Sequence, residues 1–128
     1  MDNIQKNKII TVEQIPVWIK AHIFVLAIYK ITNTFPKSEL FGLISQIRRS
    51  SSSIPANITE GFYRNTTKEL IQYLYNARGS LGESSYHLRL ALDLGYISIQ
   101  EYQNFKEEID NIGKQINGWI KSLKGKIK

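Results

Sequence analysis

The chain contains no cysteine, which excludes disulfides, a thiol nucleophile and cysteine-ligated metal sites. The absence of disulfides suits a cytoplasmic protein. Histidine is also scarce, since His22 and His87 are the only two. A di-iron carboxylate bundle needs Glu-x-x-His motifs on two helices, whereas the one Glu–His helical pair here is Glu83 with His87, four residues apart. We therefore expect no metal site, and we interpret His87 as an ordinary polar position.

Catalytic motifs are missing as well. Residues 50–53 are consecutive serines, but they lack the Gly-x-Ser-x-Gly setting of a serine nucleophile, and nothing in the sequence specifies a histidine partner. No glycine-rich phosphate-binding loop is present. The sequence therefore predicts a protein that is not an enzyme, with no catalytic residue and no cofactor.

Long apolar runs are absent too. The most apolar stretch, residues 23–29, is far shorter than the roughly 20 residues that span a bilayer. Residues 1–8 are polar and lack the basic and apolar regions of a signal peptide. We expect a soluble, cytoplasmic protein without a membrane partner.

Acidic residues stop at Asp110, and every charged residue after it is a lysine. The net charge is +6 and the pI is about 9.6. This balance favours a polyanionic partner, either nucleic acid or an acidic membrane surface, although proteins with no such partner often share it. Lysines near a helix end also complement the helix dipole, so part of the excess has a structural explanation. The late lysines are Lys114, Lys121, Lys124, Lys126 and Lys128.

Four segments show helical periodicity, and no strand pattern competes with them. Thr66 with Glu69 and Ser98 with Glu101 have capping-box spacing, and Gly95 suits a helix end. Short connections between long helices predict one all-α domain, an antiparallel up-down-up-down four-helix bundle. Within this single domain of residues 1–128, we expect a tail or short turn over residues 1–15 and helices over about residues 16–34, 38–61, 66–94 and 98–124.

The second helix is unusual because Pro55 lies inside it. A proline inside a helix costs about 3 kcal/mol or more, and a loop would avoid that cost. The helical spacing continues past the proline, however, and favours a kinked helix from Ser38 through Pro55 to Gly61, with nearby serines bonding the freed backbone groups. The residues that keep this spacing are Leu40, Ile44, Ile47, Ser51, Ile54 and Ile58.

Two glycines, Gly79 and Gly82, fall in the middle of the third helix. Each costs about 1 kcal/mol there relative to alanine. We predict that a neighbouring helix approaches them closely, as small residues permit.

The first helix is apolar on more than one side, whereas a helix on the outside of a monomer should keep a polar face. Trp18 and Val25 lie off its main apolar stripe. We interpret these two residues as part of an oligomer interface. The alternative is a central helix in an irregular monomer. The main stripe is made of Ala21, Phe24, Ile28, Ile31 and Phe35.

Polar and charged residues interrupt the middle of the second and third helices. One interpretation is a polar network that fixes helix register, and the other makes the arginines phosphate contacts. Phe62 and Tyr63 could stack on bases or pack in the core. We assign Arg48, Asn57, Glu60 and Glu83 to the structural network. We assign Arg49, Arg64, Lys68, Arg78, Lys121 and Lys124 to nucleic-acid binding.

Several motifs carry a resemblance that covers about residues 12–122. The most specific are Ser-Ile-Pro-Ala-Asn-Ile-Thr-Glu-Gly at residues 53–61 and Ala-Arg-Gly-Ser-Leu at residues 77–81, and residues 29–40, 46–50 and 94–96 also match. Together they resemble the bacterial four-helix-bundle family of the 23S rRNA intervening-sequence protein. Thr59 departs from the family pattern, which usually has alanine there.

The resemblance implies a left-handed four-helix bundle that assembles into a ring-like homopentamer, and it supports the continuous helix through Pro55. A related branch contains the accessory proteins of diversity-generating retroelements, which are basic and pentameric and work with a reverse transcriptase and its RNA. Together with the net charge, this predicts a non-catalytic homopentamer that binds nucleic acid, most of all structured RNA. The alternative is a protein-interaction scaffold or an accessory subunit for an enzyme such as a reverse transcriptase.

Overall fold

The computed structural model describes residues 11–127, which form helices and connections without a strand. The predicted all-α four-helix class is therefore confirmed. The predicted tail falls largely on residues 1–10, outside the described residues. The long helices are α2 (Pro16–Thr32), α3 (Leu43–Phe62), α4 (Thr67–Asp93) and α5 (Ile99–Lys124), and the short 3-10 helices are η1 (Val12–Gln14) and η2 (Lys37–Glu39).

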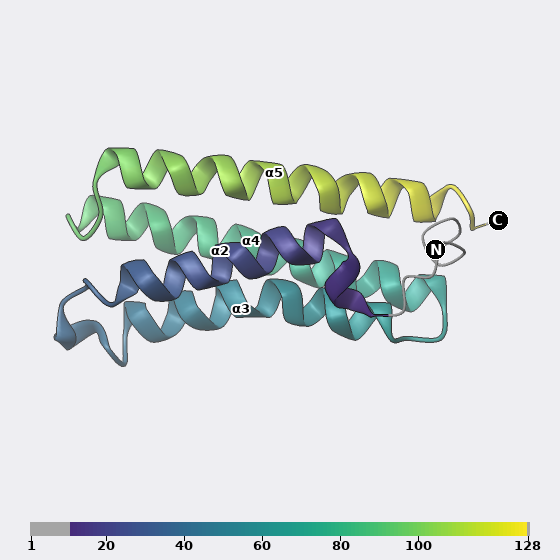
Figure 1. Ribbon diagram of the computed structural model, residues 1–128, viewed down its shortest axis with the longest axis horizontal. Helices are drawn as coiled ribbons and strands as arrows, with labels where there is room; N and C mark the ends of the chain where they lie inside the picture. The colour runs from purple at the N-terminus through teal and green to yellow at the C-terminus, as the bar shows by residue number, and fades with distance from the viewer. Residues whose placement is uncertain (1–10, 128) are drawn as a thin grey trace.

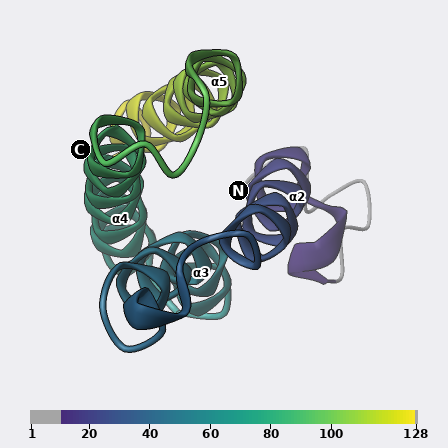
Figure 2. The same cartoon turned by 90° about the vertical axis from the view of Figure 1, so that its left-hand side faces the viewer.

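The four long helices lie side by side along the long axis of the molecule (Figure 1). The α2–α3 and α4–α5 connections lie at one end, and the α3–α4 connection lies at the other end with the last turn of α5. Seen from the first of these ends, the helices form an open arc, with α3 and α4 between α2 and α5 (Figure 2). The closest packing is between α3 and α4, and the loosest is between α2 and α5. The handedness of the bundle stays a prediction.

Each long helix contributes apolar side chains that are wholly buried in a common core. Removing such a side chain from water contributes about 1.5–3 kcal/mol. The helices are therefore held mainly by packing of their apolar faces rather than by helix propensity. The largest of these side chains are Phe24 and Ile28 of α2, Ile47, Ile54 and Ile58 of α3, Leu74 and Leu88 of α4, and Ile112, Ile116 and Leu123 of α5.

α3 runs without interruption through Pro55, as predicted. Ile54 and Ile58 are both wholly buried, so the apolar seam that the helix preserves offsets the cost of the proline. The serine hydroxyls bond carbonyl oxygens three residues earlier: Ser51 Oγ and Ser52 Oγ each donate at 3.2 Å. They therefore reinforce the turn before the proline and do not reach the carbonyl that Pro55 leaves free.

α3 begins at Leu43, later than the predicted start near Ser38. The N-cap is Gly42, where φ and ψ are both −113°, and the carboxylate of Glu39 bonds the first helical amide in place of the predicted cap, Ser38. Its Oε1 accepts a hydrogen bond from the Leu43 amide at 3.0 Å, and its Oε2 accepts one from the Tyr96 hydroxyl at 2.8 Å. These hydrogen bonds lower the pKa of Glu39 and attach the start of α3 to the α4–α5 connection.

The glycines inside α3 and α4 play different parts from those predicted, whereas Gly95 does not. Gly61 is helical, and a Cβ there would lie 2.8 Å from Tyr73 Cβ, so this is where α3 and α4 approach closely. Around Gly79 and Gly82, by contrast, an added Cβ would meet nothing within 4 Å among the described residues. Gly95 has a φ of 81° and ends α4 in the left-handed conformation, as predicted.

None of the helices in residues 11–127 combines the length and apolar character needed to cross a bilayer.

Candidate nucleic-acid interface

Two cations of the predicted nucleic-acid set share one aromatic ring between α4 and α5. The Arg78 guanidinium carbon lies 4.8 Å from the centre of the Tyr75 ring, and Lys124 Nζ lies 5.6 Å from it. Lys124 Nζ also donates to the Tyr75 hydroxyl at 2.9 Å, and Arg78 Nη1 donates to Asn117 Oδ1 at 3.0 Å. No ion pair within residues 11–127 includes either cation. Their positive charges are held in place without a carboxylate to neutralise them.

Lys68 and Lys121 extend this cationic surface. Lys68 is seven residues before Tyr75, or two helical turns, so the two share a side of α4. Lys121 precedes Lys124 by nearly one turn on α5. Both lysines are exposed and bond no side chain in the described chain. We call these five residues, Lys68, Tyr75, Arg78, Lys121 and Lys124, the basic face.

The first half of α5 is mainly acidic, with Lys106 as its one basic residue, and the second half is basic. The four acidic residues of α5, Glu101, Glu107, Glu108 and Asp110, all precede Asn111. The charged residues after Asn111 are Lys114, Lys121 and Lys124. The basic face therefore occupies the half of the bundle that is nearer to the α3–α4 connection (Figure 1).

Arg64 lies in the α3–α4 connection and is bonded to residues outside the basic face. Its Nη2 donates to Glu60 Oε2 at 2.8 Å and to the Tyr73 hydroxyl at 2.6 Å, and its guanidinium carbon lies 4.9 Å from the Tyr73 ring centre. The Glu60 ion pair partly neutralises this arginine, so Arg64 offers less charge to an anion than Arg78 does.

Arg49 belongs to a third location. Its Nη2 pairs with Glu83 Oε2 at 3.1 Å and donates to Gln46 Oε1 at 2.9 Å. It also borders a hollow beside Tyr29 and the exposed Phe41. The six residues assigned to nucleic-acid binding thus form one group of four with Tyr75, and two separate arginines.

The four residues assigned to a structural network make bonds in separate places. Arg48 Nε donates to Thr32 Oγ1 at 2.9 Å and so joins α3 to the end of α2. Asn57 Nδ2 donates to Ser53 O at 2.8 Å, and Ser80 Oγ reaches Ser53 Oγ at 3.1 Å, which joins α3 to α4. Glu60 and Glu83 bind the two separate arginines, Arg64 and Arg49.

A buried polar cluster between α3 and α4 was missed in the sequence. Ser50 Oγ lies 2.9 Å from Ser84 Oγ and 3.2 Å from His87 Nδ1. Burial lowers the pKa of His87, the Arg49 charge lowers it further, and Glu83 opposes the shift. Because only 1 % of Ser50 is exposed, this serine–histidine pair cannot reach a substrate and instead joins two helices. The sequence contains one sign of this cluster: Ser84 lies between Leu81 and Leu88 at helical spacing, where a buried apolar residue is expected.

The two residues assigned to an oligomer interface are held within the bundle. Val25 is buried at 8 % exposure, and Trp18 Nε1 donates to Thr59 Oγ1 at 2.9 Å while its ring stacks on His22. Phe62 likewise packs against the core, whereas Tyr63 is exposed. The aliphatic residues that α2 exposes to solvent lie beside them and are Ile19, Ile23 and Leu26, with exposed fractions of 41 %, 53 % and 56 %.

Comparison with known proteins identifies a family and a structural neighbour. The family described as 23S rRNA-intervening sequence protein matches residues 13–118. A crystal structure of a protein of unknown function from the S23 ribosomal protein family of Bacteroides thetaiotaomicron VPI-5482 has a TM-score of 0.76 and 27 % sequence identity, over 82 % of this chain and 95 % of that one. A comparison with curated proteins gives no match.

Proposed function

Because the chain belongs to the family of 23S rRNA-intervening sequence proteins, we propose that it binds structured RNA through its basic face, without catalysing a reaction. The observation that carries the proposal is the pair of cations, Arg78 and Lys124, held on the Tyr75 ring without a carboxylate partner. The phosphates of a nucleic acid supply the negative charge that this group lacks. The Tyr75 ring and the Arg78 guanidinium also offer flat surfaces on which unpaired bases stack.

The length of the basic face suits a backbone rather than a small anion. Lys68 and Arg78 are ten residues apart, which is about 15 Å along a helix axis. Contacts over that length reach several phosphates, so affinity should fall steeply as salt rises. Side chains cannot reach the base edges in the deep, narrow major groove of duplex RNA, which favours recognition of RNA shape over sequence.

The experiment is a salt titration of binding to an RNA hairpin, duplex DNA and single strands. The variant Arg78→Gln/Lys124→Gln removes two phosphate contacts and should reduce the slope of log affinity against log salt by about 1.4–1.8. The control Lys20→Gln/Lys37→Gln removes the same charge from exposed lysines of α2 and η2 and should leave the slope near that of the native protein. Equal losses in both variants, or no binding at about 50 mM salt, would reject the proposal.

We also propose that the chain assembles into a homopentamer. The supporting observation is the row formed by Ile19, Ile23 and Leu26, because a water-exposed apolar stripe on a helix is typical of an interface. This row lies next to Trp18 and Val25, the residues first assigned to the interface. The measurement is sedimentation equilibrium, which should give a mass near five times that of the 14.8 kDa chain.

A second candidate function, a protein-interaction scaffold, has its own supporting observation. Phe41, in the connection before α3, is 93 % exposed, and its neighbour Leu40 is 50 % exposed. An aromatic side chain so fully in water is a common anchor in protein interfaces. A partner protein that co-purifies after nuclease treatment, and is lost in Phe41→Ala but kept in Arg78→Gln/Lys124→Gln, would favour the scaffold over RNA binding.

A further inference from the structure

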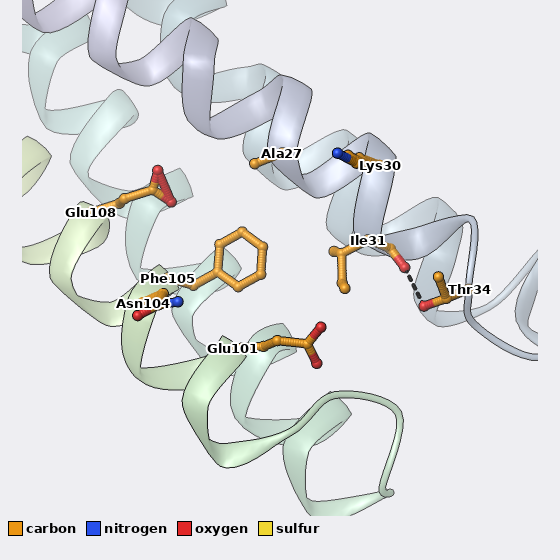
Figure 3. A pocket seen from close by; sticks show the side chains of 8 residues that line it. All are labelled: Ala27, Lys30, Ile31, Thr34, Glu101, Asn104, Phe105 and Glu108. Atoms are coloured by element: carbon orange, nitrogen blue, oxygen red, sulfur yellow. Dashed lines mark hydrogen bonds between the residues drawn. The ribbon is translucent and has the colours of Figure 1, made fainter.

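The loosely packed seam between α2 and α5 contains a groove of about 380 Å³ (Figure 3). Its floor is apolar and comes from Ala27 and Ile31 on α2 and from Phe105 on α5. Phe105 is buried, and its ring meets the Phe24 ring edge to face at 6.0 Å, which fixes its orientation. The groove therefore has a rigid aromatic base on the acidic half of α5, away from the basic face.

Two carboxylates stand on either side of this aromatic base. Glu101, Phe105 and Glu108 follow one another at spacings of four and three residues, so they share one side of α5 (Figure 3). Seven residues separate the two glutamates, which is about 10 Å along the helix axis. The groove thus presents two negative charges with an apolar surface between them.

Neither carboxylate is neutralised within the described chain. Glu101 Oε1 accepts a hydrogen bond from the Ser98 amide at 2.8 Å, and its other oxygen has no bond among residues 11–127. Glu108 is half-buried, makes neither a hydrogen bond nor an ion pair there, and has its pKa raised by burial. It also borders two neighbouring hollows, which Lys20 and Lys114 line, yet neither lysine comes within 4.0 Å of a carboxylate oxygen. A partly desolvated carboxylate without a partner is unfavourable, and a cation in the groove would relieve that cost.

We propose that the groove binds an elongated aliphatic polyamine, with one ammonium group at Glu101, another at Glu108 and the methylene chain over Phe105. A divalent metal ion fits poorly, because it needs several oxygen ligands around one point and these carboxylates are two turns apart. A single amine would leave one carboxylate unpaired. Ammonium and adjacent methylene groups also interact favourably with an aromatic face.

The other charges of the chain also affect which ligand the groove would bind. The chain carries a net charge of +6, so a polycation is repelled overall and is attracted only where carboxylates gather. Lys30 stands on the α2 wall of the groove and opposes a cationic ligand. Its long side chain is exposed and can turn towards solvent. Because the Lys30 charge still opposes a cationic ligand, removing it should strengthen binding of that ligand.

The test is isothermal titration calorimetry of the full chain with spermidine at about 50 mM salt, beside butylamine and Mg²⁺. One spermidine should bind per chain, and neither butylamine nor Mg²⁺ at equal concentration should displace it. Glu108→Gln should weaken binding about tenfold or more, as expected for the loss of a charge-assisted hydrogen bond. Glu107→Gln, the same change at the exposed neighbouring residue outside the groove, should have little effect, and Lys30→Gln should bind more tightly.

Three outcomes would overturn the proposal. The first is an absence of spermidine binding by folded native protein. The second is an equal loss in Glu107→Gln and Glu108→Gln, or displacement by Mg²⁺, since either result indicates general charge attraction. In the third outcome, the native protein does not bind spermidine and Glu108→Gln changes the sedimentation mass, which would assign the groove to a contact between copies of the chain. Glu108→Gln removes an unpaired half-buried charge and should stay folded, which circular dichroism checks.

Discussion

Replacing Gly61 by alanine tests the close approach of α3 and α4. The added Cβ would lie 2.8 Å from Tyr73 Cβ, 3.0 Å from Leu70 Cδ1 and 3.3 Å from the Leu70 carbonyl oxygen. Tyr73 Cβ and the Leu70 carbonyl cannot rotate away, because they belong to or adjoin the α4 backbone. The two helices must therefore separate slightly at their tightest contact. Overpacking of this kind costs about 1–3 kcal/mol.

The helix propensity of alanine opposes that cost. Alanine is favoured over glycine inside a helix by up to about 1 kcal/mol, and by less near a helix end such as Gly61. We therefore expect Gly61→Ala to lower the free energy of unfolding by about 1–2 kcal/mol. The matched control is Gly79→Ala, also in a helix, where the new Cβ meets nothing within 4 Å. This variant should raise the free energy of unfolding by up to about 1 kcal/mol.

The assay is urea unfolding followed by circular dichroism, at several protein concentrations so that assembly is separated from the stability of the single chain. The two variants should move the urea midpoint in opposite directions from the native value. A Gly61→Ala protein that is as stable as Gly79→Ala would refute the close approach, because propensity alone would then explain both changes.

Two further predictions concern a histidine and an interface. The pKa of His87 is lowered below its ordinary value of 6.5, so as the pH falls the unfolded chain protonates His87 at a higher pH than the folded chain does. The contribution of His87 to the free energy of unfolding should therefore be complete above that value and should fall as the pH drops towards the pKa of the folded state. The urea midpoint should be lower at pH 5.5 than at pH 7.5, and this difference should be smaller in His87→Gln. Leu26→Glu should stay helical and lose sedimentation mass, whereas Val25→Glu, one residue away but buried, should lose helicity. The same mass in Leu26→Glu as in the native protein would contradict the interface on α2.

The parts of the fold that depend on repeated apolar spacing could be predicted from the sequence. Ile54 and Ile58 continue one helix face across Pro55, and burial of that face outweighs a local cost that taken alone would favour a loop. The start of α3 could not be predicted in this way. It depends on Glu39, whose carboxylate is placed by a hydrogen bond from Tyr96, more than fifty residues later in the chain.

Residues whose role depends on a neighbouring helix were predicted less well. Gly61 was placed at a helix end, and α3 does end one residue later, but Gly61 also makes the close helix contact that was predicted for Gly79. The sequence does not state which helix face meets which. His87 was missed for the same reason: its partner Ser50 is 37 residues away. The cations Arg78 and Lys124 were identified by type, while their common ring, Tyr75, became evident only when α4 and α5 were placed together.

The unequal packing of the four helices has a consequence for how the molecule opens. α3 and α4 share the tightest contact and the buried Ser50–Ser84–His87 cluster, whereas α2 and α5 meet loosely across the arc of the bundle. Local unfolding begins where buried contacts are fewest. The backbone amides of α3 and α4 should therefore exchange with solvent deuterium only on global unfolding, and those of α2 and α5 by smaller openings of lower free energy. A molecule that bridges the α2–α5 seam would slow exchange in those two helices first.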